Sequence, residues 1–190
     1  MAEHLDLDRW DSIEHSLRAA EDLYLVERVR KGGKPSPEGQ AREKLERDLD
    51  AACELYIHGS PIERERIRGA FTGAWLLSRE LYRRAQYPLR TDKSPEQDLR
   101  RALAAYVLWL EFIVAQNGSQ GFGHGDFFLP LGAIWVQAHR DGLDPSACMR
   151  EAQGWVTEGK AGDRARDFLH AFPTTAYFRA DVIPRLSPRE

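Results

Sequence analysis

Cysteine and long apolar runs are scarce in this sequence of 190 residues. Its two cysteines, Cys53 and Cys148, are too few for the disulfide framework of a small secreted protein. The longest apolar run, 102–115, is interrupted by Glu111 and is shorter than the about 20 residues that a membrane-spanning helix needs. The first ten residues contain three acids instead of the basic start and apolar stretch of a secretory signal. We therefore expect a soluble protein of the cytoplasm that does not contact a membrane.

Short catalytic and metal-binding motifs are also missing. The sequence contains no His-Glu-x-x-His, no Cys-x-x-Cys and no His-x-x-x-His, which are spacings typical of metal sites. It contains no Gly-Lys-Ser/Thr either, which excludes a phosphate-binding P-loop. We therefore predict no metal and no cofactor, and the sequence favours a role other than catalysis.

The composition is that of a folded globular protein. Hydrophobic residues make up 42% of the chain and charged residues 30%, which is not the balance of a disordered protein. A single domain of this length buries roughly 70% of the surface of its unfolded chain. Because no internal repeat or long linker divides the sequence, we predict one helical domain over residues 1–190.

Serine or aspartate followed by proline marks the start of several predicted helices. The first residue can cap the helix with its side chain, and proline suits the first helical position. These pairs are Ser36-Pro37, Ser60-Pro61, Ser94-Pro95 and Asp144-Pro145. With helix-ending glycine and proline, they predict helices at about 8–31, 37–58, 61–86, 95–116, 127–141, 145–158 and 163–172, and a short piece after Thr174.

The helix predicted at about 95–116 differs from the others because apolar residues occupy nearly every position from 102 to 115. Such a helix is apolar on every face and must be surrounded by protein. The other helices carry apolar residues at steps of three and four, which place one apolar face toward a core. No segment shows the strict alternation of a strand. The sequence predicts an all-α bundle of about seven or eight helices around this central helix.

A glycine-rich loop follows the central helix, with four glycines between positions 118 and 125. Glycine loses much conformational entropy when a loop becomes ordered, so packing or a bound group must compensate. One interpretation is therefore a functional surface formed by Phe122, His124 and Asp126. The alternative is a tight turn in which Phe122 packs inward and Asp126 caps the next helix.

If the protein is an enzyme or binds a small ligand or metal, this loop is the predicted site. His124 would act as acid, base or ligand, Asp126 would be its carboxylate partner, and Glu111 would lie beneath them. Glu111 is otherwise expected to pair with an arginine or to reach solvent, because an unpaired buried carboxylate is costly.

The function predicted first is the binding of another protein through surface contacts, as an inhibitor, an immunity protein or an adaptor. Its contact surface would combine the loop residues Phe122, His124 and Asp126 with an exposed arginine ridge. That ridge consists of Arg79, Arg83 and Arg84. Arginine and aromatic side chains are favoured anchors of protein interfaces. The sequence specifies neither the identity of this partner nor an oligomeric state.

Nucleic-acid binding is a second alternative, based on Arg64, Arg66 and Arg68 after a turn between two predicted helices. Glu63 and Glu65 would face the phosphates in that arrangement, and the net charge of the chain is −3. Both features oppose the release of counterions that supplies most of the affinity for nucleic acid. The sequence therefore disfavours a nucleic-acid partner.

Overall fold

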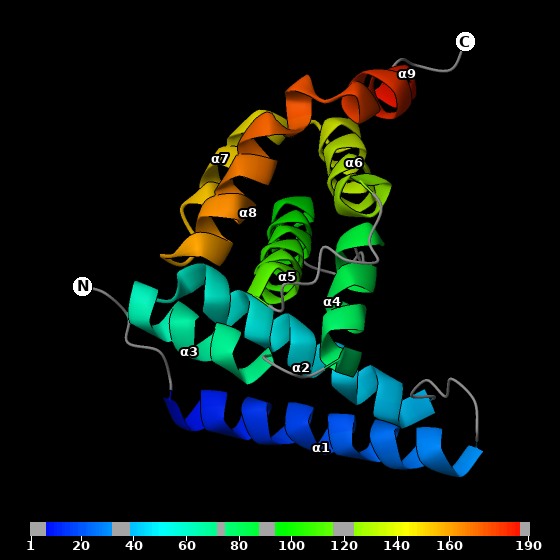
Figure 1. The fold of residues 1–190 in the computed structure, drawn as a ribbon, viewed down its shortest axis with the longest axis vertical. Helices are drawn as coiled ribbons and strands as arrows, with labels where there is room; N and C mark the ends of the chain where they lie inside the picture. The colour runs from blue at the N-terminus through cyan, green and yellow to red at the C-terminus, as the bar shows by residue number, and fades with distance from the viewer. Residues whose placement is uncertain (1–6, 32–38, 72–74, 88–93, 116–123, 187–190) are drawn as a thin grey trace. The chain divides into compact units, whose positions relative to one another are not determined.

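The chain is all-α in a computed structural model that describes residues 7–31, 39–71, 75–87, 94–115 and 124–186 (Figure 1). These residues form α-helices with short 3₁₀ and π segments and no strand, which confirms the predicted fold class. The helices are α1 (Leu7–Lys31), α2 (Gly39–His58), α3 (Pro61–Phe71), α4 (Trp75–Gln86), α5 (Pro95–Ala115), α6 (His124–Arg140), α7 (Pro145–Gln153), α8 (Lys160–Ala171), η1 (Phe172–Thr174), η2 (Phe178–Val182) and α9 (Ile183–Leu186). Within these ranges, no helix combines the length and the apolar character that crossing a membrane requires.

The chain forms two compact units, residues 1–80 and residues 81–190, within each of which the Cα atoms are close together in space. The boundary falls inside α4. The single domain expected from the sequence stays a prediction, and each unit is described by itself.

The first unit is built from the apolar faces of α1, α2 and α3. Its buried side chains recur at steps of three and four, as the sequence predicts: Trp10, Ile13 and Leu17 in α1, Leu45, Leu49, Ala52, Cys53 and Tyr56 in α2, and Ile67, Ala70 and Phe71 in α3. Polar contacts add to this packing, since Ser16 Oγ donates to Asp48 Oδ2 at 2.5 Å between α1 and α2.

The predicted caps at Ser60, Ser94 and Asp144 are present, whereas Ser36-Pro37 lies outside the described residues. Ser60 N donates to Glu63 Oε2 at 2.7 Å and Glu63 N donates to Ser60 Oγ at 3.4 Å, which is the reciprocal capping box at the start of α3. Ser94 Oγ accepts from the amide of Gln97 at 3.3 Å, and Asp144 Oδ1 accepts from the amide of Ser146 at 2.9 Å. The starts of these helices are therefore set by local sequence.

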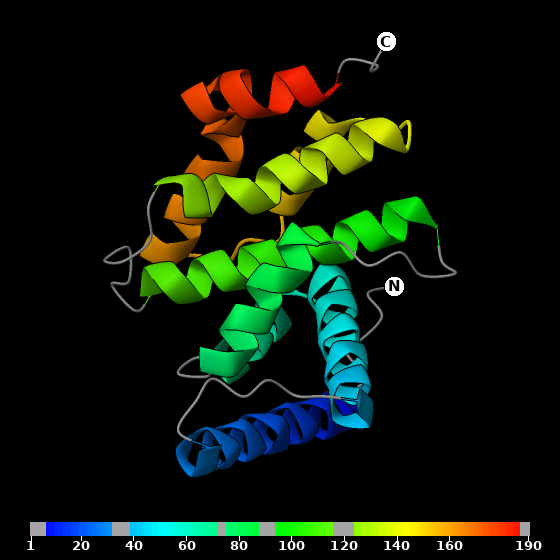
Figure 2. The same ribbon diagram turned by 90° about the vertical axis from the view of Figure 1, so that its right-hand side faces the viewer.

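The second unit is organised around α5. All residues from Asp98 to Glu111 except Arg100 are buried, and α5 contacts α6, α7 and α8 (Figures 1 and 2). Tyr106 is fully buried, and its hydroxyl donates to the carbonyl oxygen of Phe127 in α6 at 3.0 Å. Trp109 packs against the rings of Tyr106 and Phe127, with centroids 5.9 and 5.7 Å away. The buried central helix predicted at about 95–116 is confirmed.

The helix expected at 61–86 is described as α3 and α4, and residues 72–74 between them lie outside the described residues. Three predicted boundaries differ from the structure by three residues or more. The helix expected at 127–141 begins three residues earlier, at His124. The helix expected at 145–158 ends at Gln153, and the helix expected at 163–172 begins at Lys160, after Gly159, which has a φ of +106°. Glycine is favoured at that φ because it has no Cβ.

The buried hydroxyl of Tyr106 gives a test of the second unit's core. Tyr106→Phe removes the donor to the Phe127 carbonyl without leaving a large cavity, so we expect the free energy of unfolding to fall by about 1–2 kcal/mol. Urea denaturation followed by circular dichroism measures this change. Tyr87→Phe is the matched control, because Tyr87 is 61% exposed. Equal effects of the two substitutions would contradict the assigned hydrogen bond.

Candidate functional site

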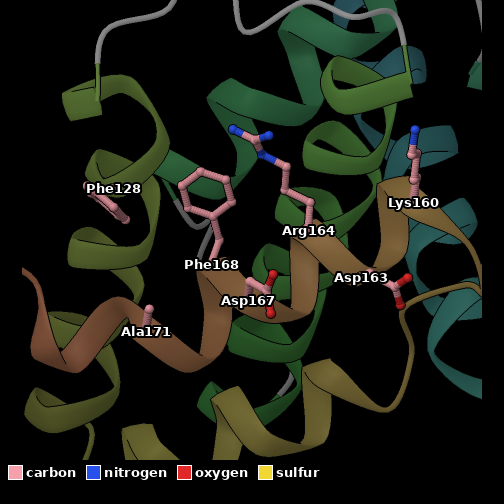
Figure 3. Close-up of a pocket in the computed structure, with 7 residues that line it drawn as sticks. All are labelled: Phe128, Lys160, Asp163, Arg164, Asp167, Phe168 and Ala171. Carbon is pink, nitrogen blue, oxygen red and sulfur yellow. The ribbon is translucent and has the colours of Figure 1, made fainter.

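A groove runs along the surface of α8, with α6 contributing one wall (Figure 3). We call it the α8 groove. Its volume is about 470 Å³, and it is lined by Phe128 of α6 and by Lys160, Asp163, Arg164, Asp167, Phe168 and Ala171 of α8. The α8 residues recur at steps of three and four, which places them on one face of the helix.

Aromatic rings join the α8 groove to the core. The ring of Phe168 stacks on that of Phe127, with centroids 5.1 Å apart and planes at 16°. The ring centroid of Phe128, in α6, lies 5.8 Å from that of Phe168. Phe127 is buried, whereas Phe128 and Phe168 are half-buried and leave part of each ring at the surface. The groove therefore has a rigid aromatic wall.

Charged side chains of both signs surround this wall. Figure 3 shows Lys160 and Arg164 extending to the same side of α8. Asp163 is bound by Arg166, whose Nη1 lies 2.7 Å from Asp163 Oδ1. In the part of the chain that the structure describes, no ion pair involves Lys160, Arg164 or Asp167. These three exposed charges can therefore meet charges of a bound molecule.

A buried carboxylate holds the segment that precedes α8. Glu111 of α5 is fully buried, and its Oε1 accepts from Thr157 N at 2.8 Å and from Thr157 Oγ1 at 2.9 Å. Hydrogen bonds to a charged group are stronger than neutral ones, and in a buried site they offset the cost of desolvation. The expectation that Glu111 reaches solvent is wrong, because Thr157 covers this side of α5.

The carbonyl side of Thr157 is held by α8 itself. Nη2 of Arg166 donates to the carbonyl oxygens of Val156 and Thr157 at 3.0 and 3.1 Å. Gly162 is buried there, and a Cβ added to it would lie 1.8 Å from Thr157 O. Only glycine permits this close approach, so Glu111, Gly162 and Arg166 together fix the amino end of α8 and hence the groove.

The glycine-rich loop is only partly described. Phe122 and residues 118–121 lie outside the described residues, and His124 is described only as the first residue of α6. Asp126 was expected to cap the next helix, but it lies inside the first turn of α6, where a negative charge interacts favourably with the helix dipole. Burial, together with smaller contributions from Asp126 and two tyrosines, raises the pKa of Tyr82 to about 12. Glu111 thus accepts hydrogen bonds from Thr157, and the charge of Asp126 adds to the pKa shift of Tyr82.

The predicted arginine ridge is not uniformly exposed. Arg79 is exposed, Arg83 is half-buried and Arg84 is only 5% exposed. Arg84 follows buried Leu81 by three residues, which places it on the apolar face of α4. Arg84 therefore does not belong to an exposed ridge.

The arginines considered for nucleic-acid binding make contacts within the first unit. Arg64 donates to the carbonyl oxygens of Tyr56 and Ile57 at 2.9 and 2.8 Å, at the end of α2. Burial lowers the pKa of Arg64 from its usual value. Arg66 pairs with Asp11 at 2.5 Å, and Arg68 pairs with Glu65. A nucleic acid would have to compete with these contacts.

No three His, Cys, Asp or Glu side chains of the described residues come together in a way that could hold a metal ion. Comparisons with protein-family models, curated proteins and solved structures find no match to this chain.

Sequence reasoning missed the α8 groove and its support. The only signals were Val156 and Thr157, whose β-branched side chains lower helix propensity, and the glycines at 159 and 162. Neither signal identifies the groove, which requires Phe128 from a different helix.

Gly162 provides a test of how α8 is seated. Gly162→Ala would bring Cβ against Thr157 O, so we expect the free energy of unfolding to fall by about 1–3 kcal/mol in spite of the better helix propensity of alanine. Gly69→Ala is the matched control, because nothing lies within 4 Å of its added Cβ. It should be neutral or stabilising by up to about 1 kcal/mol. Urea denaturation measures the free energy of unfolding of both variants. A stabilising effect of Gly162→Ala would overturn the assigned contact.

The hydrogen bonds between Glu111 and Thr157 give a second test. Thr157→Val removes the hydroxyl donor while keeping the shape of the side chain, and we expect a loss of about 1–3 kcal/mol. Glu111→Gln should lose part of the same energy, so the double variant should cost less than the sum of the single ones. Urea titrations of the four proteins measure this coupling. Additive losses would show that the two residues act separately. Thr174→Val serves as the control, because it removes an exposed hydrogen bond, from Thr174 Oγ1 to Ala171 O, in place of a buried one.

Proposed function

We propose that this protein binds another protein through surface contacts, without catalysis, as an inhibitor, an immunity protein or an adaptor. The observation that carries the proposal is the α8 groove, in which exposed charges without ion pairs in the described residues lie beside two half-buried aromatic rings. Arginine and aromatic side chains are enriched among the residues that anchor protein interfaces.

The openness of the charged rim favours a large partner. Small molecules usually bind in enclosed, mostly apolar pockets that cover most of the ligand. Lys160, Arg164 and Asp167 are all exposed, and their charges stay hydrated in the free chain. A protein partner can cover this rim and exclude water from it, which strengthens charge–charge contacts.

The predicted loop adjoins the α8 groove in sequence, because Asp126 precedes Phe128 by two residues in α6. We therefore keep Phe122, His124 and Asp126 as proposed contact residues, of which Phe122 lies outside the described residues. The alternative, a small-ligand or enzyme site at the loop, has less support because Glu111 is engaged by Thr157. The α8 groove is a second place for a small ligand, since its volume of about 470 Å³ falls in the range of small-ligand sites.

We further propose that the protein works in the cytoplasm. Cys53 and Cys148 are both free thiols in the structure, which suits a reducing compartment.

Site-specific photo-cross-linking in the native cells tests the proposed function. A photoreactive amino acid is placed at Arg164 in the full-length chain, and the cross-linked products are identified by mass spectrometry. We expect one protein adduct of defined mass. The matched control carries the same amino acid at Arg179, which is exposed and does not line the groove.

An adduct from Arg164 but not from Arg179 would support a protein partner at the groove. Identical adducts at both positions, or none at either, would contradict the proposal. If neither position gives an adduct, a rise in melting temperature with nucleotides, phosphates or divalent ions would favour the small-ligand alternative, because a ligand of the folded state raises apparent stability.

A further inference from the structure

The two ends of the α8 groove differ in chemistry. Lys160 and Arg164 lie in the first two turns of α8 and form what we call the cationic end. The helix dipole adds a partial positive charge at this terminus. Asp163 lies there too, but its charge is largely balanced by Arg166 at 2.7 Å. This end therefore attracts a negatively charged group.

The other end of the groove is apolar. It is formed by Phe128, Phe168 and Ala171, and we call it the aromatic end. Phe128 also packs on Phe172 and Tyr177, with centroids 6.0 Å away in both cases, so its ring is held in place. A fixed, half-buried ring offers contact area at a low cost in conformational entropy.

We propose that the α8 groove binds an amphipathic helix of a partner protein, with carboxylates at the cationic end and a large apolar side chain at the aromatic end. This inference rests on the proposed function and names the chemistry of the partner. An added strand is not favoured, because the described residues contain no sheet edge with which it could pair.

The spacing along α8 suits a helical partner. Arg164 lies four positions after Lys160, and Phe168 lies four positions after Arg164, which is a rise of about 6 Å for each step. A partner helix repeats this spacing with residues at i, i+4 and i+8 on one face. Two glutamates followed by a leucine or phenylalanine at this interval would match the groove.

A polyanion fits less well than a carboxylate-bearing helix. The groove contains Asp163 and Asp167 as well as its two cations, so its side chains carry no net charge. Strong binding of nucleic acid requires an excess of cations that displace counterions from phosphates. A partner with a few carboxylates and an apolar anchor places each group against one end and avoids a high density of negative charge beside Asp167.

Synthetic helical peptides test this inference with the full-length protein. The acidic peptide is an alanine-based helix of about 16 residues with two glutamates at i and i+4 and a leucine and a phenylalanine one turn further on. A second peptide replaces the glutamates with lysines, and a third replaces the apolar pair with alanines. Fluorescence anisotropy measures their dissociation constants. We expect the acidic peptide to bind about tenfold more tightly than the lysine peptide, the size expected of two exposed ion pairs.

Charge reversal in the protein supplies the controls. The variant Lys160→Glu with Arg164→Glu should reverse the preference and bind the lysine peptide more tightly. The matched control, Arg140→Glu with Arg179→Glu, makes the same change in net charge at exposed positions outside the groove and should keep the original preference. Melting curves establish that each variant is folded.

Equal binding of the acidic and lysine peptides, or the same preference in both double variants, would overturn the inference. So would tighter binding of a single-stranded oligonucleotide than of the acidic peptide. If cross-linking from Arg164 captures a protein while the acidic peptide does not bind, the inference fails and the proposed function stands. If cross-linking captures no protein, the proposed function fails whatever the peptides do.

Discussion

The buried carboxylate of Glu111 is the constraint on which the second unit depends. It lies in α5, the most apolar helix of the chain, where an ionised group without hydrogen bonds would cost several kcal/mol. Thr157 supplies two donors to one of its oxygens. An amide inside an α-helix is already bonded to a carbonyl four residues back, so Thr157 can offer its N–H only if α7 has ended before it. The end of α7 at Gln153 leaves Thr157 outside the helix, and its amide donates to Glu111.

The same peptide unit determines where α8 begins. The carbonyl of Thr157 accepts from Arg166, and Gly162 lets the first turn of α8 approach that carbonyl more closely than any side chain would permit. Both polar groups of the Thr157 backbone are thus engaged, one by α5 and one by α8. Because α5 and α8 are also in direct contact, the two helices are joined by apolar packing and by directional hydrogen bonds. This fixes which face of α8 stays outside, and that face carries the groove.

Local sequence predicts most of the fold, because helix caps and apolar helix faces are determined by residues that are close together in the chain. The caps at Ser60, Ser94 and Asp144 are satisfied within a few residues, and the apolar stripe of α2 or the all-round apolar surface of α5 can be recognised without knowing what packs against it. The end of α7 differs from the prediction, and there the structure shows a tertiary contact between Thr157 and Glu111. The prediction of one helix over residues 145–158 used local sequence only. It could not take account of the hydrogen bond from Thr157 to Glu111, which is 46 residues away in the chain.

The groove escaped prediction for a related reason. Charges at steps of three and four along α8 are typical of a solvated helix face, and Phe168 alone resembles a core residue. The site arises only when Phe128 of α6 is placed across from that face. Its exposed charges contribute little to the stability of the free chain, since an exposed ion pair is worth about 0–1 kcal/mol at most. Their contribution to binding can be larger, because a partner that covers the neighbouring aromatic rings also excludes water from the charges and strengthens their interaction. Affinity would then come mainly from the aromatic end, and the choice of partner from the cationic end.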